Sequence, residues 1–187
     1  MAALLDQVRT VVGEMMEDRG SSELPEDDPL TARFSEGLTD TLWIQSFVGG
    51  GVVVVYPVVD ADAVADLRAE IERNGRVPLI VVALNKITPA ARSALASEPE
   101  CEVFAGDFFK TNRYRNAMVP EMARAPAAEV AAFLKAKRIT EGKLARMHVD
   151  DPVARYFAAK SGEVFKFRVK LGYLQPVWRY RLVVPAT

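Results

Sequence analysis

The sequence predicts an α/β protein made of two units, residues 1–111 and residues 112–187. In the first unit, short apolar runs alternate with segments of helical periodicity, which is the pattern of an α/β layer. The charge also differs between the two units. Residues 1–111 hold 9 Lys and Arg against 19 Asp and Glu, a net charge of −10, whereas residues 112–187 hold 15 against 6, a net charge of +9. This asymmetry favours two modules with different partners.

The first unit is expected to begin with an amphipathic helix over residues 3–19, because apolar side chains recur there at helical spacing. An acidic, proline-bearing connection follows at residues 23–29. Residues 41–47 and 52–57 are predicted to be strands on either side of a triple-glycine turn at residues 49–51. The glycines are followed by a strand and by no Lys-Ser or Lys-Thr pair, so this turn does not fit a phosphate-binding loop.

Strands and helices then alternate to the end of this unit. A helix is expected over residues 60–75, capped by its first aspartate. Residues 78–84 form a continuous apolar run, which is typical of a strand buried on both faces. A threonine-proline pair opens the next helix, residues 88–97, and residues 102–104 are predicted to be a short last strand.

The second unit begins after a polar and basic segment at residues 110–116. An alanine-rich helix is expected from Pro126 onward, and a second short helix is expected to contain Leu144. The chain then closes with two predicted strands, residues 163–170 and residues 177–184. Apolar and basic side chains alternate along the first of these strands. We therefore expect the sheet to have one apolar face and one basic face.

The segment before these strands carries the most specific motif. Asp-Pro-Val-Ala-Arg-Tyr-Phe at residues 151–157 predicts a one-turn helix, because Asp151 can cap it and Pro152 suits its first position. Ser-Gly-Glu-Val-Phe-Lys at residues 161–166 predicts a glycine turn that enters a strand. The last strand carries Arg-Tyr-Arg-Leu-Val-Val at residues 179–184. In order and spacing these motifs resemble the assembly domain of the fifth-largest subunit of eukaryotic RNA polymerases I, II and III, a family with an archaeal counterpart.

The resemblance extends into the rest of the chain. Residues 79–82 and 87–92 are similar to the apolar strand and Thr-Pro helix start of that family, and Met-Val-Pro-Glu at residues 118–121 is similar to its entry into the assembly domain. Ala158 stands where the family has a glycine. The chain is also shorter than the usual eukaryotic members, which suits a divergent protist or a large DNA virus that encodes its own polymerase.

The resemblance implies an N-terminal jaw domain, a nuclease-like α/β layer without catalysis, followed by a small mixed α/β assembly domain. In this family the assembly domain packs on the largest subunit, and the jaw lies near downstream duplex DNA. The implied function is that of a non-catalytic subunit of a multisubunit DNA-directed RNA polymerase, without cofactor or membrane partner. The implied location is the nucleus, or a viral factory or virion if a virus encodes the chain.

Two sets of residues follow from the resemblance. The DNA-proximal set is a helix start with flanking cations: Lys86, Thr88, Pro89 and Arg92. The subunit-interface set joins the helical turn to the basic strand residues: Asp151, Pro152, Arg155, Tyr156, Lys166, Arg168, Arg179 and Arg181. From composition alone, the basic residues of the second set could contact nucleic-acid phosphates or an acidic protein surface, and composition slightly favours nucleic acid; the resemblance instead implies docking on a protein.

Two alternatives from other functional classes stay open. A metal-dependent nuclease needs clustered carboxylates and a nearby lysine, for which Asp40 and Glu70 are candidates. However, residues 78–84 lack the Asp/Glu-x-Lys pattern that such a fold would place there, and Glu-Gly-Lys at residues 141–143 falls in the other unit. The second alternative is a free-standing basic protein that binds RNA or DNA.

Single chemistry-bearing residues add little to these hypotheses. Cys101 is the only cysteine, which excludes an intramolecular disulfide and favours a buried thiol in a reducing compartment. His148 is the only histidine, and we expect a surface or capping role for it and no metal site. The longest apolar runs are too short for a membrane span, and the N-terminus lacks the pattern of a signal peptide.

Overall fold

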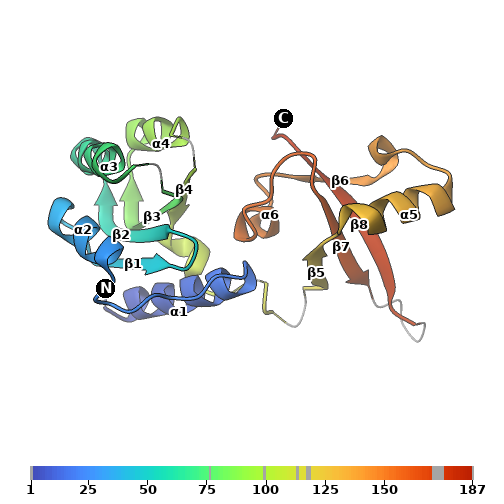
Figure 1. The fold of residues 1–187 in the computed structure, drawn as a ribbon, viewed down its shortest axis with the longest axis horizontal. Helices are drawn as coiled ribbons and strands as arrows, with labels where there is room; N and C mark the ends of the chain where they lie inside the picture. The colour runs from blue at the N-terminus through green and yellow to red at the C-terminus, as the bar shows by residue number, and fades with distance from the viewer. Residues whose placement is uncertain are drawn as a thin grey trace. The chain divides into compact units, whose positions relative to one another are not determined.

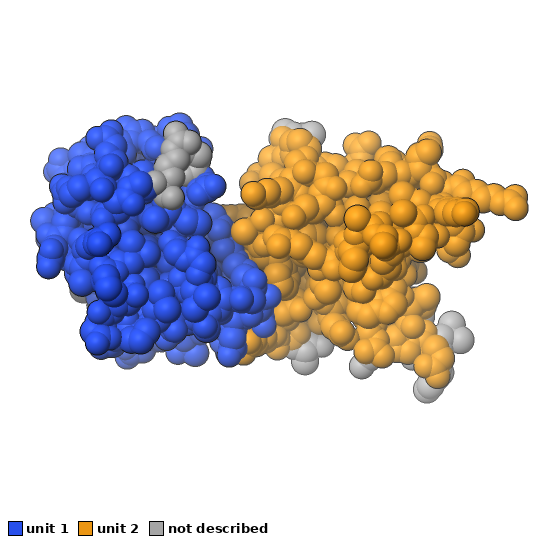
Figure 2. Space-filling model, in the orientation of Figure 1, with its two compact units in different colours: residues 1–111 blue, residues 112–187 orange. Residues whose placement is uncertain are grey.

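A computed structural model describes residues 2–75, 77–98, 100–112, 114–116, 119–169 and 175–186 (Figure 1). The chain divides into two compact units, residues 1–111 and residues 112–187 (Figure 2). The division falls where the net charge of the sequence changes sign. Each unit has its own mixed α/β architecture, in agreement with the predicted fold class.

The first unit contains a four-stranded sheet in the order β1-β2-β3-β4. β1 (Trp43–Phe47) pairs antiparallel with β2 (Gly51–Val59), and β2, β3 (Leu79–Ile87) and β4 (Cys101–Ala105) run parallel. The helices of this unit are α1 (Ala2–Asp18), α2 (Pro29–Gly37), α3 (Ala61–Asn74), α4 (Pro89–Ala96) and the 3₁₀ helix η1 (Gly106–Phe109).

Helices cover both faces of this sheet. Figure 1 shows α2, α3 and α4 on one side of it and α1 on the other. Val54 in β2 packs in a cluster with Leu67 of α3, whereas its neighbours Val53 and Val55 point to the opposite face and are equally buried. In β3, Leu79, Val81 and Ala83 belong to the same cluster, and the alternate residues Ile80, Val82 and Leu84 are also buried. Burial on both faces explains why residues 78–84 are uniformly apolar, and it confirms the prediction of a strand there.

Helix α2 was not predicted from the sequence, although its start has a clear local signal. Asp28 caps it, accepting from the amides of Leu30 at 2.9 Å and Thr31 at 3.4 Å, with Pro29 in the first helical position. The Asp28 carboxylate also accepts from the Ser46 hydroxyl at 2.9 Å, which lowers the pKa of Asp28. The acidic connection therefore ends as a cap that ties α2 to β1.

The other predicted elements of this unit are present. Asp60 caps α3 through the amide of Ala63, and Gly75 ends it with a φ of 79°. β3 extends three residues beyond the predicted strand, because its register with β2 continues to Ile87. Lys86 therefore lies within the strand, directly before the start of α4.

The second unit contains a four-stranded sheet in the order β5-β7-β8-β6. β5 (Glu121–Arg124), β7 (Val164–Val169) and β8 (Val177–Val184) pair antiparallel, whereas β6 (Ala145–His148) runs parallel to β8. Its helices are α5 (Ala127–Lys137), the 3₁₀ helix η2 (Glu141–Lys143) and α6 (Pro152–Tyr156). The structure confirms the predicted strands at residues 163–170 and 177–184 and the predicted helices that begin at residues 126 and 152. Two residues of the predicted segments, Lys170 and Met118, lie outside the described residues.

The prediction of a short helix at Leu144 is wrong. A single 3₁₀ turn ends at Lys143, and β6 begins at Ala145. Leu144 is 7% exposed and packs with Val130 of α5 and Val164 of β7. The segment is therefore extended because it pairs with β8 and buries Leu144, and neither contact is visible in the local sequence.

Both faces of the second sheet carry apolar clusters. One cluster, around Phe165 and Phe167, includes Ala154 of α6, and the other, around Val164, includes Val130 of α5. The predicted division into one apolar and one basic face is therefore wrong: α5 covers part of the face that was predicted to be basic.

No helix among the described residues is both long and apolar enough to cross a membrane.

Candidate subunit interface and DNA-proximal helix

Helix α6 has the capped structure that its motif predicts. The Asp151 carboxylate accepts from the Val153 amide at 2.9 Å, and Pro152 occupies the first turn, where its missing N–H costs nothing. Pro152 is exposed and Arg155 is half-buried in the last turn. The motif thus builds a short capped turn that contains one basic side chain, Arg155.

Tyr156 belongs to the core of the second unit. Its side chain is 3% exposed, and its hydroxyl accepts from the Asn112 amide at 3.0 Å. Its ring stacks on Tyr114 with 5.3 Å between the centroids and meets Phe157 edge-on. This burial favours a structural role for Tyr156, which would support an interface from within and not touch the partner directly.

Lys166 is engaged inside the second unit. Its ammonium lies 2.7 Å from the Glu129 carboxylate of α5 and 5.1 Å from the centre of the Trp178 ring. Glu129 also accepts from the Tyr180 hydroxyl at 2.7 Å. The bonds from Lys166 and Tyr180 lower the pKa of Glu129, and partial burial together with Glu129 raises the pKa of Tyr180 to about 12. This network ties α5 to the sheet.

Arg168, two residues along β7 from Lys166, lies on the surface. Its guanidinium is 3.1 Å from the Glu121 carboxylate on β5, and both side chains are about half exposed. Such exposed pairs contribute little free energy, so Arg168 can exchange this partner for another at small cost.

Arg179 and Arg181 are exposed and lie on the same face of β8 as Val177. The strand register places Arg179 opposite Phe167 and Arg181 opposite Phe165. The guanidinium of Arg181 lies over the Phe167 ring, 4.9 Å from its centre. Val177 is 46% exposed beside them. We call Val177, Arg179 and Arg181 the β8 basic face; it combines two cations with accessible apolar surface.

In the first unit, the four residues predicted to be DNA-proximal meet at the start of α4. The Thr88 hydroxyl accepts from the Ala91 amide at 3.3 Å, and Pro89 occupies the first turn. Lys86 and Arg92 are exposed, and neither forms an ion pair with a described residue. A helix N-terminus flanked by two unpaired cations can attract an anion.

Carboxylates lie at the same edge of the sheet. The Thr88 amide donates to the Val59 carbonyl at 3.0 Å, which joins the turn before α4 to the turn after β2. That second turn leads into α3, whose cap Asp60 and first-turn residue Asp62 are both exposed. Their negative charge opposes anion binding nearby, so any phosphate contact at α4 should be weak.

The second unit matches a known domain. Residues 111–183 match the family model described as RNA polymerase Rpb5, C-terminal domain. The chain carries an Rpb5 C-terminal domain. The match begins within one residue of the start of the compact second unit and ends within β8. It supports a subunit of DNA-directed RNA polymerase with a role in transcription, and it confirms the family resemblance drawn from the motifs of residues 151–184.

One departure of the Rpb5 domain from the family pattern has a measurable consequence. Ala158 has a φ of 49°, the left-handed conformation that favours the glycine found there in the family. We expect Ala158→Gly to stabilise the Rpb5 domain by about 0.5–1 kcal/mol. Denaturant unfolding of the full chain, followed by a signal from this domain, measures the change in its free energy of unfolding. Ala159→Gly, at a neighbouring position without positive φ, should instead destabilise; equal losses from both substitutions would contradict the prediction.

The carboxylates considered for a nuclease do not form a metal centre in the described parts of the chain. No group of three or more His, Cys, Asp or Glu side chains there is placed to hold a metal ion. Glu70 is 1% exposed and bonds to Arg73 and to the Asn74 amide, the latter at 2.8 Å. Asp40 is exposed in the loop after α2. The Glu70 carboxylate is therefore engaged by side chains of its own helix, α3.

The single cysteine and histidine have ordinary environments. Cys101 packs against the core of the first unit, and burial, with Glu98 and Glu102 nearby, raises the pKa of its thiol to about 12. A thiol with so high a pKa is a poor nucleophile at neutral pH. His148 is exposed at the end of β6, with its Nδ1 3.2 Å from the Pro185 carbonyl.

Sequence reasoning missed three residues that shape the Rpb5 domain's candidate interface. Val177 lies on the face shared by the two arginines, which the period of two along β8 could have indicated. Glu129 binds Lys166, and Asn112 binds Tyr156, across 37 and 44 residues respectively. No local pattern indicates contacts at such separations.

Proposed function

We propose that this chain is a non-catalytic subunit of a multisubunit DNA-directed RNA polymerase. Residues 112–187 anchor it to the largest subunit, and residues 1–111 form part of the jaw that guides downstream duplex DNA. It acts in the nucleus, or in a viral factory or virion if a virus encodes it. The observation that carries the proposal is the match of residues 111–183 to the Rpb5 C-terminal domain, over a compact unit with its own core.

The β8 basic face is the best candidate for the anchoring surface. Lys166 and Tyr156 are occupied by internal contacts, whereas Arg179 and Arg181 expose their charges next to the half-exposed Val177. Arginine with adjacent apolar surface is a frequent centre of protein interfaces. The net charge of +9 on residues 112–187 suits an acidic partner surface.

The jaw role is supported by the start of α4. Its amides, with Lys86 and Arg92, offer two or three contacts to a phosphate backbone. So few contacts release few counterions, which makes the contact weak and its salt dependence shallow. The net charge of −10 on residues 1–111 should prevent the free protein from binding duplex DNA at physiological salt.

Capture experiments with the two units test the anchoring role. We expect residues 112–187 alone to co-purify with the largest polymerase subunit and residues 1–111 not to do so. The fragment begins at Asn112 because this side chain bonds to Tyr156 in the core. Capture by residues 1–111 alone would reverse the assignment. Binding of the full chain to free RNA or DNA, without polymerase subunits, would favour the nucleic-acid-binding alternative.

Crosslinking tests the jaw role. A photo-crosslinker at position 89 is expected to react with downstream DNA in an active elongation complex. Lys86→Glu with Arg92→Glu should leave assembly intact and weaken retention of downstream DNA about 3–10-fold, as expected for the loss of two phosphate contacts. Glu26→Gln with Asp27→Asn, at two exposed positions away from α4, is the control for the effect of substituting any two charged surface residues. Absence of any crosslink from position 89 would exclude the DNA contact and leave the subunit assignment standing.

A further inference from the structure

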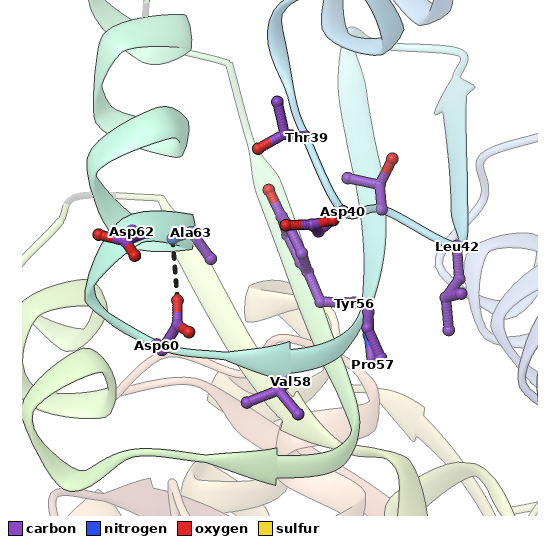
Figure 3. Close-up of a pocket in the computed structure, with 10 residues that line it drawn as sticks. Thr39, Asp40, Leu42, Tyr56, Pro57, Val58, Asp60, Asp62 and Ala63 are labelled. Carbon is purple, nitrogen blue, oxygen red and sulfur yellow. Dashed lines mark hydrogen bonds between the residues drawn. The ribbon is translucent and has the colours of Figure 1, made fainter.

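A pocket of about 440 Å³ opens beside β2 in the first unit (Figure 3). Three carboxylates line it: Asp40 from the loop after α2, and Asp60 and Asp62 from the start of α3. Pro57 and Val58 of β2 form an apolar part of its wall, and Val58 is 38% exposed. The pocket therefore combines anionic groups with a small accessible apolar surface.

The three carboxylates have oxygen atoms that can accept further hydrogen bonds. Asp60 uses one oxygen to accept from the Ala63 amide at 3.2 Å. Asp40 and Asp62 are exposed, and no ion pair with a described residue engages them. Three neighbouring anions without a cation repel one another, so a positively charged ligand would be stabilised among them.

Tyr56 supplies a second and independent observation. Its side chain lines the same pocket and is fully buried, yet its hydroxyl has no hydrogen-bond partner among the described residues. Figure 3 shows the ring extending from β2 along the pocket, with the hydroxyl towards Thr39 and the Asp40 loop. Burial, with Asp66 and Glu70 nearby, raises the pKa of Tyr56, so the group is a neutral phenol. A buried hydroxyl without a partner is uncommon and indicates a missing ligand or water.

The chemistry of these groups selects the ligand. Carboxylates only accept hydrogen bonds, and a phenol can also accept one, so the ligand must be a donor with several N–H groups. A guanidinium has five N–H donors in one plane, and its apolar stem can lie on Pro57 and Val58. A divalent cation fits less well, because the described carboxylates are not grouped closely enough to hold a metal ion.

We propose that this pocket binds an arginine side chain presented by a partner protein. The net charge of −10 on residues 1–111 would draw a basic segment towards it. The proposal does not rest on the polymerase assignment, since it uses groups of the first unit alone.

Titration of the full chain, ¹⁵N-labelled, with N-acetyl-arginine methylamide tests the proposal. We expect saturable shifts of the amides at residues 39–42, 56 and 58–63, with a Kd of about 1–10 mM, which is reasonable for so small a ligand. The citrulline analogue, which has nearly the same shape and no charge, should give no saturable shifts. Equal responses to both ligands, or none to the arginine analogue up to about 50 mM, would overturn the proposal.

Matched variants distinguish binding of the arginine analogue in the pocket from its general electrostatic attraction to the acidic first unit. Asp40→Asn with Asp62→Asn should weaken binding at least about 5-fold, whereas Glu26→Gln with Asp27→Asn, which removes the same charge elsewhere on the surface, should leave it unchanged. Tyr56→Phe should weaken it about 2–5-fold through the loss of one hydrogen bond. Equal losses in the two double variants would overturn the proposal, as would tighter binding of Mg²⁺ at the same amides.

Discussion

Arg179→Glu with Arg181→Glu is expected to abolish capture of the largest polymerase subunit by the full chain. Both guanidinium groups are exposed on the β8 basic face, so each substitution replaces an attraction to the partner by a repulsion. Reversing two charges at the centre of an interface should weaken binding by about 100-fold or more, which corresponds to about 2.7 kcal/mol. Co-purification from cells that express the tagged variant, followed by affinity measurement with the purified partner, gives the result.

Two controls make this result specific. Lys135→Glu with Lys137→Glu reverses two exposed charges on α5 of the same unit, and it should reduce capture by less than about 3-fold. Arg179→Gln with Arg181→Gln removes both charges and keeps part of each apolar stem, so it separates the loss of charge attraction to the partner from damage to the fold. If the α5 variant loses capture as fully as the β8 variant, the β8 basic face is not the anchoring surface.

Gly37→Ala is expected to destabilise the first unit by about 2 kcal/mol. Gly37 ends α2, and a methyl group there would overlap the carboxylate of Glu70, which is buried and held by Arg73 and Asn74. Overpacking of this kind typically costs about 1–3 kcal/mol. If the Glu70 carboxylate did not occupy this space, replacing a helical glycine by alanine would stabilise the unit by about 0.5–1 kcal/mol.

A double-mutant cycle with Glu70→Ala tests this cause directly. In the Glu70→Ala background the space is vacant, so the destabilisation by Gly37→Ala should disappear and the substitution should become neutral or stabilising. Thermal and denaturant unfolding of the four proteins measure the coupling. Gly51→Ala, where a methyl group would meet only the Pro78 carbonyl at 3.7 Å and the end of the Met16 side chain at 3.9 Å, is the control. A Gly37→Ala cost that persists in the Glu70→Ala background would contradict the packing role of Glu70.

Local rules of helix capping made much of the fold predictable. Asp60, Thr88 and Asp151 each accept from an amide two or three residues onward, as their sequence positions indicate. The same rule applies to Asp28, so the sequence also contains the signal for the start of α2. β5 and β6 are different: each has four residues, too few for a periodic signal, and each exists through its pairing with β7 or β8.

The sequence by itself determined the α/β class, the change of charge near residue 111 and the motifs that resemble the polymerase subunit, because these depend on composition, periodicity and spacing along the chain. Only the tertiary structure decided which predicted site residues are free to act. Alternation along a strand assigns side chains to two faces but does not say what covers each face. Here α5 brings Glu129 to Lys166, whereas Arg179 and Arg181 stay exposed on the opposite face, since no described element covers them.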